Sequence, residues 1–194
     1  MNIREGMPDD SWFIAGVVTG ALGHDLCVEL AGSEQRLPLA TELFARLAAD
    51  PDSQYSYRNT LIATNDHGMP IGGIIAYDGA DLHRLRKAFI REANGILGWN
   101  VTEKEAEDWG DEAQPDEIYI DSLYVVPEYR RRGVASALLM GIERRFAVSN
   151  KPVGLLVEPE NDRALEAYTH WGFKRVGISH FFRTPMIHMQ KAKG

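Results

Sequence analysis

The chain has 194 residues, of which 44% are hydrophobic and 25% are charged, a composition ordinary for one globular domain spanning residues 1–194. A formal net charge of −7 argues against nucleic acid as the main partner, because such binding depends mostly on neutralising phosphates. No window approaches 18 uncharged apolar residues and the first residues are polar, so we expect no membrane association and a cytoplasmic location.

The residues that commonly bind metals are few and scattered. Cys27 is the single cysteine, which excludes an intramolecular disulfide, and we interpret it as a buried structural thiol. No two histidines have the spacing of metal ligands on one helix face, and we therefore expect no metal site. The histidines are His24, His67, His83, His170, His180 and His188.

In chain order, the first half predicts a strand, two helices and a hairpin. Residues 1–6 read as a short strand, and the sequence from Pro8 to Ser11 starts a helix that should end near Gly20 or Gly23. A second helix is predicted from residue 37 to residue 50, while the intervening segment 24–36 is ambiguous. Residues 57–64 and 71–77 read as a hairpin, in which the pair Gly72 and Gly73 predicts a bulge or a close approach of another chain segment.

Residues 79–116 form a long connection with a change of charge along it. A helical stripe of Leu82, Leu85, Phe89 and Ala93 comes first, with basic residues mostly on the rest of the helix surface. Nearly all charged residues from 103 to 117 are then acidic. This pattern indicates a solvated helix and a solvated loop whose charges pair with each other.

The second half alternates strands and helices. Strands are expected at 117–126, 152–157, 173–178 and 185–189, with helices at 133–149 and from Asn161 to Trp171. This order predicts an α/β fold, a mixed central sheet of about seven strands with helices on both faces.

The strand at 117–126 leads through an arginine-rich turn into the helix at 133. Small residues at the helix start leave its first backbone N–H groups accessible, and the helix dipole adds about half a positive charge there. Three consecutive arginines, Arg130, Arg131 and Arg132, add full charges beside those groups. The turn therefore predicts a site for a small polyanion such as a pyrophosphate.

Two motifs in this half resemble those of the GNAT acyltransferase superfamily, including its bacterial-type members. The first is Arg130-x-x-Gly133-x-Ala135, which resembles the acyl-CoA signature, and the second runs from Asn161 to Tyr168 and on to Gly172-Phe173. The resemblance covers residues 117–190 closely and the first 116 residues weakly. The connection at 79–116 is longer than is usual in the family, and we treat it as an insertion.

The resemblance implies how acetyl-CoA, the acyl donor, would bind. The strand backbone around Leu123, Tyr124 and Val125 would pair with the pantetheine arm and polarise the thioester carbonyl. Asn161 would contact the same arm. The pyrophosphate would lie on the turn and helix start formed by Arg130, Arg131, Arg132, Gly133, Val134, Ala135 and Ser136.

Candidates for proton transfer come from a helix and from the central strand. Tyr168 matches the general acid of many relatives, although it also fits a core aromatic residue. Residues 117, 119, 121, 123 and 125 should share one strand face, which carries two carboxylates, Glu117 and Asp121. A carboxylate among apolar residues is either held in a structural pair or has a pKa suited to proton transfer. Tyr119 stands at a position where some relatives carry a glutamate.

The function implied is that of an acetyl-CoA dependent N-acetyltransferase acting by direct transfer to a primary amine. A non-catalytic acyl-CoA binding or sensing module is the alternative, and a nucleotide-binding module is disfavoured because no Gly-Lys-Ser/Thr follows the turn. The acceptor amine stays open. A homodimer is the default expectation for a soluble protein.

Overall fold

The seven strands of the described residues form one mixed sheet. The computed structural model describes residues 1–181 and 184–193. The strand order is β1-β2-β3-β4-β5-β7-β6, in which β4 and β5 run parallel and all other neighbours run antiparallel. The strands are β1 (Asn2–Glu5), β2 (Thr60–Thr64), β3 (Pro70–Asp78), β4 (Ile118–Val125), β5 (Val153–Val157), β6 (Lys174–Phe181) and β7 (Thr184–Lys191).

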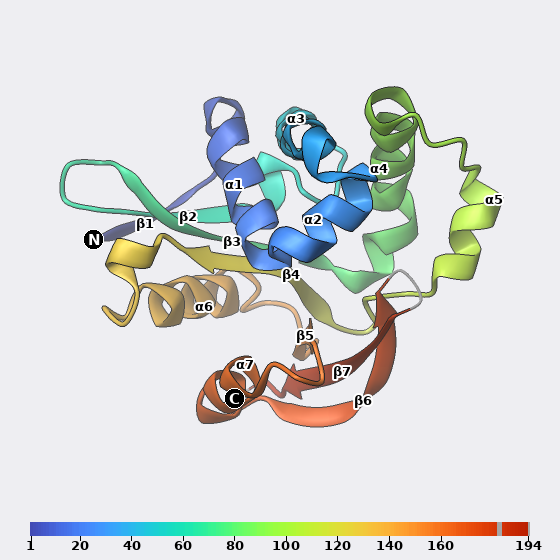
Figure 1. Ribbon diagram of the computed structural model, residues 1–194. Helices are drawn as coiled ribbons and strands as arrows, with labels where there is room; N and C mark the ends of the chain where they lie inside the picture. The colour runs from blue at the N-terminus through green and yellow to red at the C-terminus, as the bar shows by residue number, and fades with distance from the viewer. Residues whose placement is uncertain (182–183, 194) are drawn as a thin grey trace.

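The helices cover both faces of the sheet, as the sequence predicts (Figure 1). One layer contains the first four helices, and α6 and α7 lie on the other side. The helices are α1 (Ser11–Leu22), α2 (His24–Ala31), α3 (Leu37–Ala49), α4 (Leu82–Leu97), α5 (Glu103–Ala106), α6 (Val134–Arg145) and α7 (Asp162–His170).

Two apolar clusters hold these layers on the sheet. One lies under α6 and contains Leu138, Ile142, Ile118 and Ile120, all of them buried. The other lies under α1, α3 and α4 and contains Phe44 and Phe89 with Ile62 and Ile75. β4 stands fourth of seven in the strand order and contacts elements of both layers, so it is the centre of the sheet as predicted.

Gly72 and Gly73 mark the close approach that the sequence predicts. A side chain at Gly72 would begin 3.0 Å from the Tyr124 carbonyl oxygen, and one at Gly73 would begin 2.8 Å from a methyl group of Val17. The absence of side chains at both positions lets α1 and α6 pack directly on β3.

Three local predictions need correction. The ambiguous segment 24–36 contains α2, which ends at Gly32 in the left-handed conformation. The strand predicted from residue 57 begins at Thr60, because residues 57–59 form a 3₁₀ turn that the Ser56 hydroxyl caps. The helix predicted to reach residue 149 ends at Arg145.

The predicted solvation of the 79–116 insertion is wrong at two charged residues. Arg86 and Glu112 are both buried, and the guanidinium of Arg86 donates to the Glu112 carboxylate. The predicted pairing between the two halves is present, since His83 also contacts Asp111 and Lys87 contacts Glu103. The insertion therefore closes on itself through charges that lie about 16 to 28 residues apart in the chain.

No single helix among the described residues has the length and apolar composition needed to span a membrane. The pair of helical segments 8–22 and 24–31 meets those criteria together, but it bends by 107° at their junction.

Candidate functional site

The central strand has an open edge over half of its length. β5 pairs with β4 only from Ile118 to Ile120, and beyond that point the two parallel strands separate (Figure 1). The Val126 amide donates to Ile71 in β3, so by alternation the backbone groups of Leu123 and Val125 point to the opposite, open side. The family resemblance assigns the backbone of Leu123, Tyr124 and Val125 to the pantetheine arm, but the backbone groups of Tyr124 point to β3 instead.

A bulge interrupts β4 at Asp121. Ile120 pairs with Ala76 and Ser122 pairs with Ile75, which leaves Asp121 as the extra residue between them. The prediction that residues 117, 119, 121, 123 and 125 share one face is therefore wrong. Leu123 and Val125 pack with the cluster under α6, whereas Tyr119 packs on the face that carries α4.

The turn after β4 exposes a row of backbone amides. Arg131 and Gly133 both have positive φ angles, 60° and 78°, and no hydrogen bond within the described chain uses the N–H groups from Arg131 to Ser136. Consecutive amides in such alternating conformations form a concave anion-binding site. The geometry is the one expected for phosphate binding at the start of α6.

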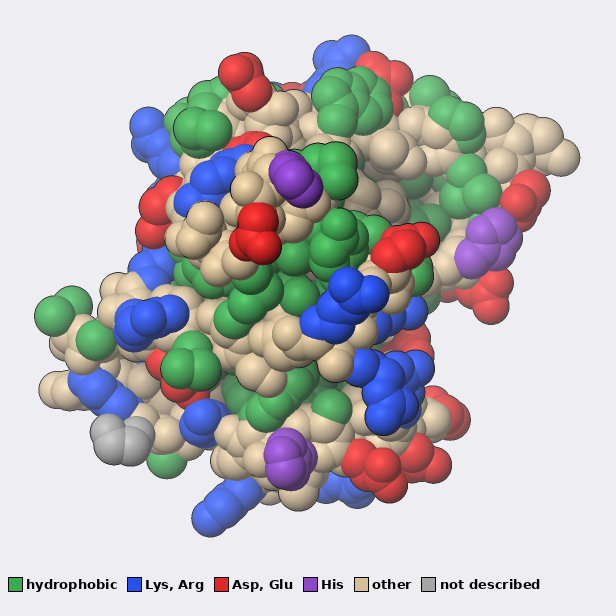
Figure 2. Space-filling view, turned by 90° about the vertical axis from the view of Figure 1, so that its left-hand side faces the viewer, with side chains coloured by type: hydrophobic (Ala, Val, Ile, Leu, Met, Phe, Trp, Pro, Cys, Tyr) green, Lys and Arg blue, Asp and Glu red, His purple; other side chains and the backbone are tan. Residues whose placement is uncertain are grey.

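The arginines of this turn are not equivalent. Arg130 donates from Nε to the Val125 carbonyl over 3.0 Å and lies over the Tyr124 ring, and Arg132 lies over the Tyr129 ring. Arg131 has no such contact within the described residues. The turn lies on the side of the molecule that faces the viewer in Figure 2, where Lys and Arg side chains border apolar ones. The net charge of −7 thus coexists with a basic local surface.

Asn161 and Tyr168 lie at the start and near the end of α7. The Asn161 side chain caps the helix by accepting from the Ala164 amide over 3.1 Å. The Tyr168 ring packs edge-on against Trp171 and Phe173, with ring centroids 5.5 Å apart in each case. Tyr168 and Leu123 both pack against the apolar cluster under α6. Burial raises the pKa of the Tyr168 hydroxyl to about 12, so it is protonated at neutral pH.

Asp121 combines partial burial with a second acidic group nearby. Burial raises the pKa of its carboxyl to about 7, and the negative charge of Glu112 adds to this effect. Hydrogen bonds from the Ser122 hydroxyl, at 2.9 Å, and from Gln54 Nε2, at 3.5 Å, act in the opposite direction. Asp121 is therefore able to take up and release a proton near neutral pH.

Glu117 lies in a different environment. Its side chain is fully buried and accepts hydrogen bonds from the Gln114 amide, from His188 Nε2 at 2.8 Å and from Gln190 at 2.7 Å. A side chain at Gly154 would clash with the Glu117 carboxylate. Glu117 thus joins the insertion to β7 through three hydrogen bonds.

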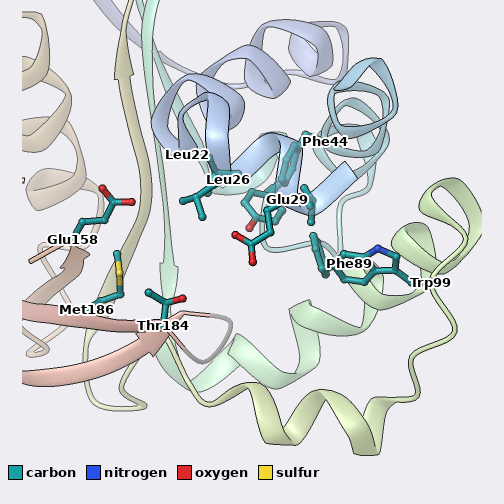
Figure 3. A pocket seen from close by; sticks show the side chains of 11 residues that line it. Leu22, Leu26, Glu29, Phe44, Phe89, Trp99, Glu158, Thr184 and Met186 are labelled. Carbon is teal, nitrogen blue, oxygen red and sulfur yellow. The ribbon is translucent and has the colours of Figure 1, made fainter. Parts of the chain in front are cut away.

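A pocket of about 210 Å³ lies between the helical layer and the start of β7 (Figure 3). Its walls are largely apolar. Its lining residues are Leu22, Leu26, Glu29, Leu30, Phe44, Tyr55, Phe89, Trp99, Glu158, Thr184 and Met186. Tyr55 lines the pocket, and its chain neighbour Gln54 donates from Nε2 to the Asp121 carboxylate over 3.5 Å, so the pocket lies near Asp121.

Sequence reasoning did not find several of these residues. Gln54 bridges Glu112 and Asp121 from a connection with no motif, and Glu29 lies in the segment that the sequence left ambiguous. No cluster of three or more His, Cys, Asp or Glu side chains in the described ranges 1–181 and 184–193 has the geometry of a metal site.

Comparisons with known proteins agree with this geometry. No curated protein is significantly similar to the chain in sequence. A solved acetyltransferase structure is 26% identical, with a TM-score of 0.72 and 100% coverage of both chains. An N-acetyltransferase from Staphylococcus aureus Mu50 is 21% identical with a TM-score of 0.73, covering 98% of this chain and 100% of that one.

A more distant structure, the PaiA N-acetyltransferase from Thermoplasma acidophilum in complex with coenzyme A, has the same fold. It is 16% identical with a TM-score of 0.56, and the alignment covers 98% of each chain. The model of the acetyltransferase (GNAT) family matches residues 27–173, which include the open strand edge, the amide-rich turn and α7. The chain belongs to the GNAT acetyltransferase family.

Proposed function

We propose that this protein is an N-acetyltransferase that moves the acetyl group of acetyl-CoA directly to a primary amine. The observation that carries the proposal is the open edge of β4, which has a group suited to the reaction at each of its two ends. At one end are the free amides of residues 131–136, and at the other is Asp121, a carboxyl group with a pKa of about 7.

The coenzyme would bind along this edge. Its pyrophosphate would accept hydrogen bonds from the free amides at the start of α6, and its pantetheine arm would pair with Leu123 and Val125 where β5 has separated. The arm then continues the sheet in place of the missing strand contact. A backbone N–H of this segment donates to the thioester carbonyl and stabilises the oxyanion that forms there.

The reaction requires three proton transfers. An ammonium ion gives one proton to the Asp121 carboxylate, and the neutral amine then attacks the thioester carbon. The new C–N bond forms as the C–S bond breaks, and Tyr168, which is protonated at neutral pH, donates a proton to the departing thiolate. The second proton on the nitrogen leaves to water, which yields the neutral amide.

A panel of primary amines tests the proposal, with release of the free coenzyme thiol as the readout. We expect acetyl-CoA to bind and at least one amine to accelerate thiol release above hydrolysis. Tight coenzyme binding with no acceleration by any amine would favour the non-catalytic acyl-CoA binding module instead.

A further inference from the structure

The pocket near Tyr55 combines aromatic walls with two acidic side chains. Phe44, Tyr55 and Phe89 are buried on one side of it, and Trp99 of the insertion completes the aromatic wall. The carboxylate of Glu29 extends from α2 into the space between the helices and β7 (Figure 3). Residues as far apart in sequence as Glu29 and Met186 line this one space.

The acidic side chains of the pocket have no partner among the described residues. Glu29 and Glu158 are exposed, and neither carboxylate forms an ion pair or hydrogen bond with another described residue. Most other pocket-lining side chains are apolar or aromatic, and none of the described lining residues is Lys or Arg. An unpaired carboxylate beside aromatic rings attracts a cation, since the ring faces are also electron-rich.

The size of the pocket limits its occupant. An apolar cavity of about 150 Å³ is known to hold one benzene ring. At about 210 Å³, this pocket has room for one ring and a short aminoalkyl chain. The apolar walls would leave the inner charges of a long polyamine without partners, and they offer few polar groups to a peptide backbone.

We propose that this pocket binds the acceptor, and that the acceptor is a primary amine carried on an apolar body about the size of a single ring. The inference rests on the proposed acetyl transfer and adds the substrate class to it. Glu29 attracts the ammonium form, the aromatic wall binds the ring, and the nitrogen reaches Asp121 past Tyr55.

The first experiment measures steady-state acetylation of 2-phenylethylamine, methylamine, spermidine and a tetrapeptide with a free N-terminus. We expect kcat/KM for 2-phenylethylamine to exceed that for each of the other three at least about tenfold, because one apolar group in a fitted pocket already gives a difference of this order. Equal or better acetylation of spermidine, the peptide or methylamine overturns the acceptor class while leaving acetyl transfer intact.

Two variants locate the binding site. Glu29→Gln should raise the KM for 2-phenylethylamine about fivefold at low salt, the effect of one partly exposed ion pair, and the difference should shrink as salt is added. The matched control Glu166→Gln, on the exposed surface of α7, should leave the KM unchanged. Leu26→Trp should fill the pocket and lower kcat/KM for 2-phenylethylamine far more than for methylamine, whereas Leu26→Met, which nearly conserves volume, should have a much smaller effect.

A direct binding measurement separates the pocket from the chemistry. Titration of 2-phenylethylamine into the protein without acetyl-CoA, followed by calorimetry or by shifts of the Trp99 signal, should show binding that Leu26→Trp abolishes. Acetyl-CoA binding by that variant should stay normal and so report a folded protein. Amine acetylation that is insensitive to both Glu29→Gln and Leu26→Trp would place the acceptor elsewhere.

Discussion

Asp121 illustrates how one extra residue in a strand creates a chemically distinct side chain. The bulge takes it out of register with β3 and brings it close to Gln54 and Glu112. Its raised pKa means that the folded protein favours the protonated form. Stability attributable to this group is therefore present at acidic pH and is lost as the pH rises towards about 7.

Asp121→Asn should separate catalysis from stability. Loss of the base should lower kcat/KM about 10²-fold to 10⁴-fold and remove the rise in rate near pH 7, while the free energy of unfolding at pH 8 increases by about 2 kcal/mol. Chemical denaturation at pH 4.5 and pH 8, with a pH–rate profile, measures both effects. A pH–rate limb that persists in the variant would show that another group or a water molecule takes the proton.

The Tyr168 hydroxyl keeps its proton at neutral pH, which the proposed role as the acid requires. Tyr168→Phe should lower turnover by about one to three orders of magnitude with little change in acetyl-CoA affinity, since only a proton donor is lost. Single-turnover kinetics and coenzyme titration test this, with Tyr57→Phe as the control. A wild-type rate in Tyr168→Phe would make the ring a packing residue of the cluster with Trp171 and Phe173.

At the scale of elements, buried charges connect α4, the long helix of the insertion, to the central strand β4. Arg86 pairs with Glu112, and Gln54 extends the contact from Glu112 to Asp121 over 3.4 Å and 3.5 Å. Such a pair costs free energy to bury but costs more to break, because one charge is then left in the interior. The insertion also supplies Phe89 and Trp99 to the pocket, so it contributes to the site both by charge and by shape.

Glu112→Gln should therefore have two effects. Arg86 would lose its main partner, which should lower the free energy of unfolding by about 3 kcal/mol. Removal of the Glu112 charge should also lower the pKa of Asp121. The limb of the pH–rate profile on which the rate rises with pH should then move to lower pH. The double variant Arg86→Met with Glu112→Leu should recover stability while keeping the shifted limb. If the limb does not move in either variant, the ion pair serves only the fold.

At the scale of the whole molecule, the sequence predicted best those features that depend on residues close together in the chain. The turn from Arg130 to Gly133 and the Asn161 cap are local, and the structure has both. The bulge at Asp121 depends on its pairing with β3, and the burial of Glu112 depends on Arg86, which lies 26 residues away. The pocket needs α2 and β7 together, so no short pattern could have revealed it.

The separation of β4 from β5 also gives the sheet its shortest strand pairing where we propose that the coenzyme binds. β4 pairs with β5 through only three residues on each strand, whereas β3 and β4 pair along seven. A ligand that pairs with the open edge and binds the start of α6 would join the two halves of the sheet. Its binding free energy would then add directly to the stability of the native state.

Acetyl-CoA should consequently raise the melting temperature of the whole protein in one cooperative transition. At about 100 times its Kd the ligand adds about 2.7 kcal/mol, which corresponds to about 5–10 °C for a chain of this size. Differential scanning calorimetry measures the shift, and adenosine, which lacks the phosphates, should produce almost none.

Arg130→Glu with Arg132→Glu should reduce the shift and flatten its dependence on salt, because the phosphates lose their cationic partners. Arg130 also binds the Val125 carbonyl, so the double variant should melt lower even without ligand, and the shift rather than the melting temperature is the quantity to compare. Lys104→Glu with Arg144→Glu makes the same change in net charge elsewhere on the surface, and a shift reduced equally in that control would attribute the effect to net charge instead of to the turn.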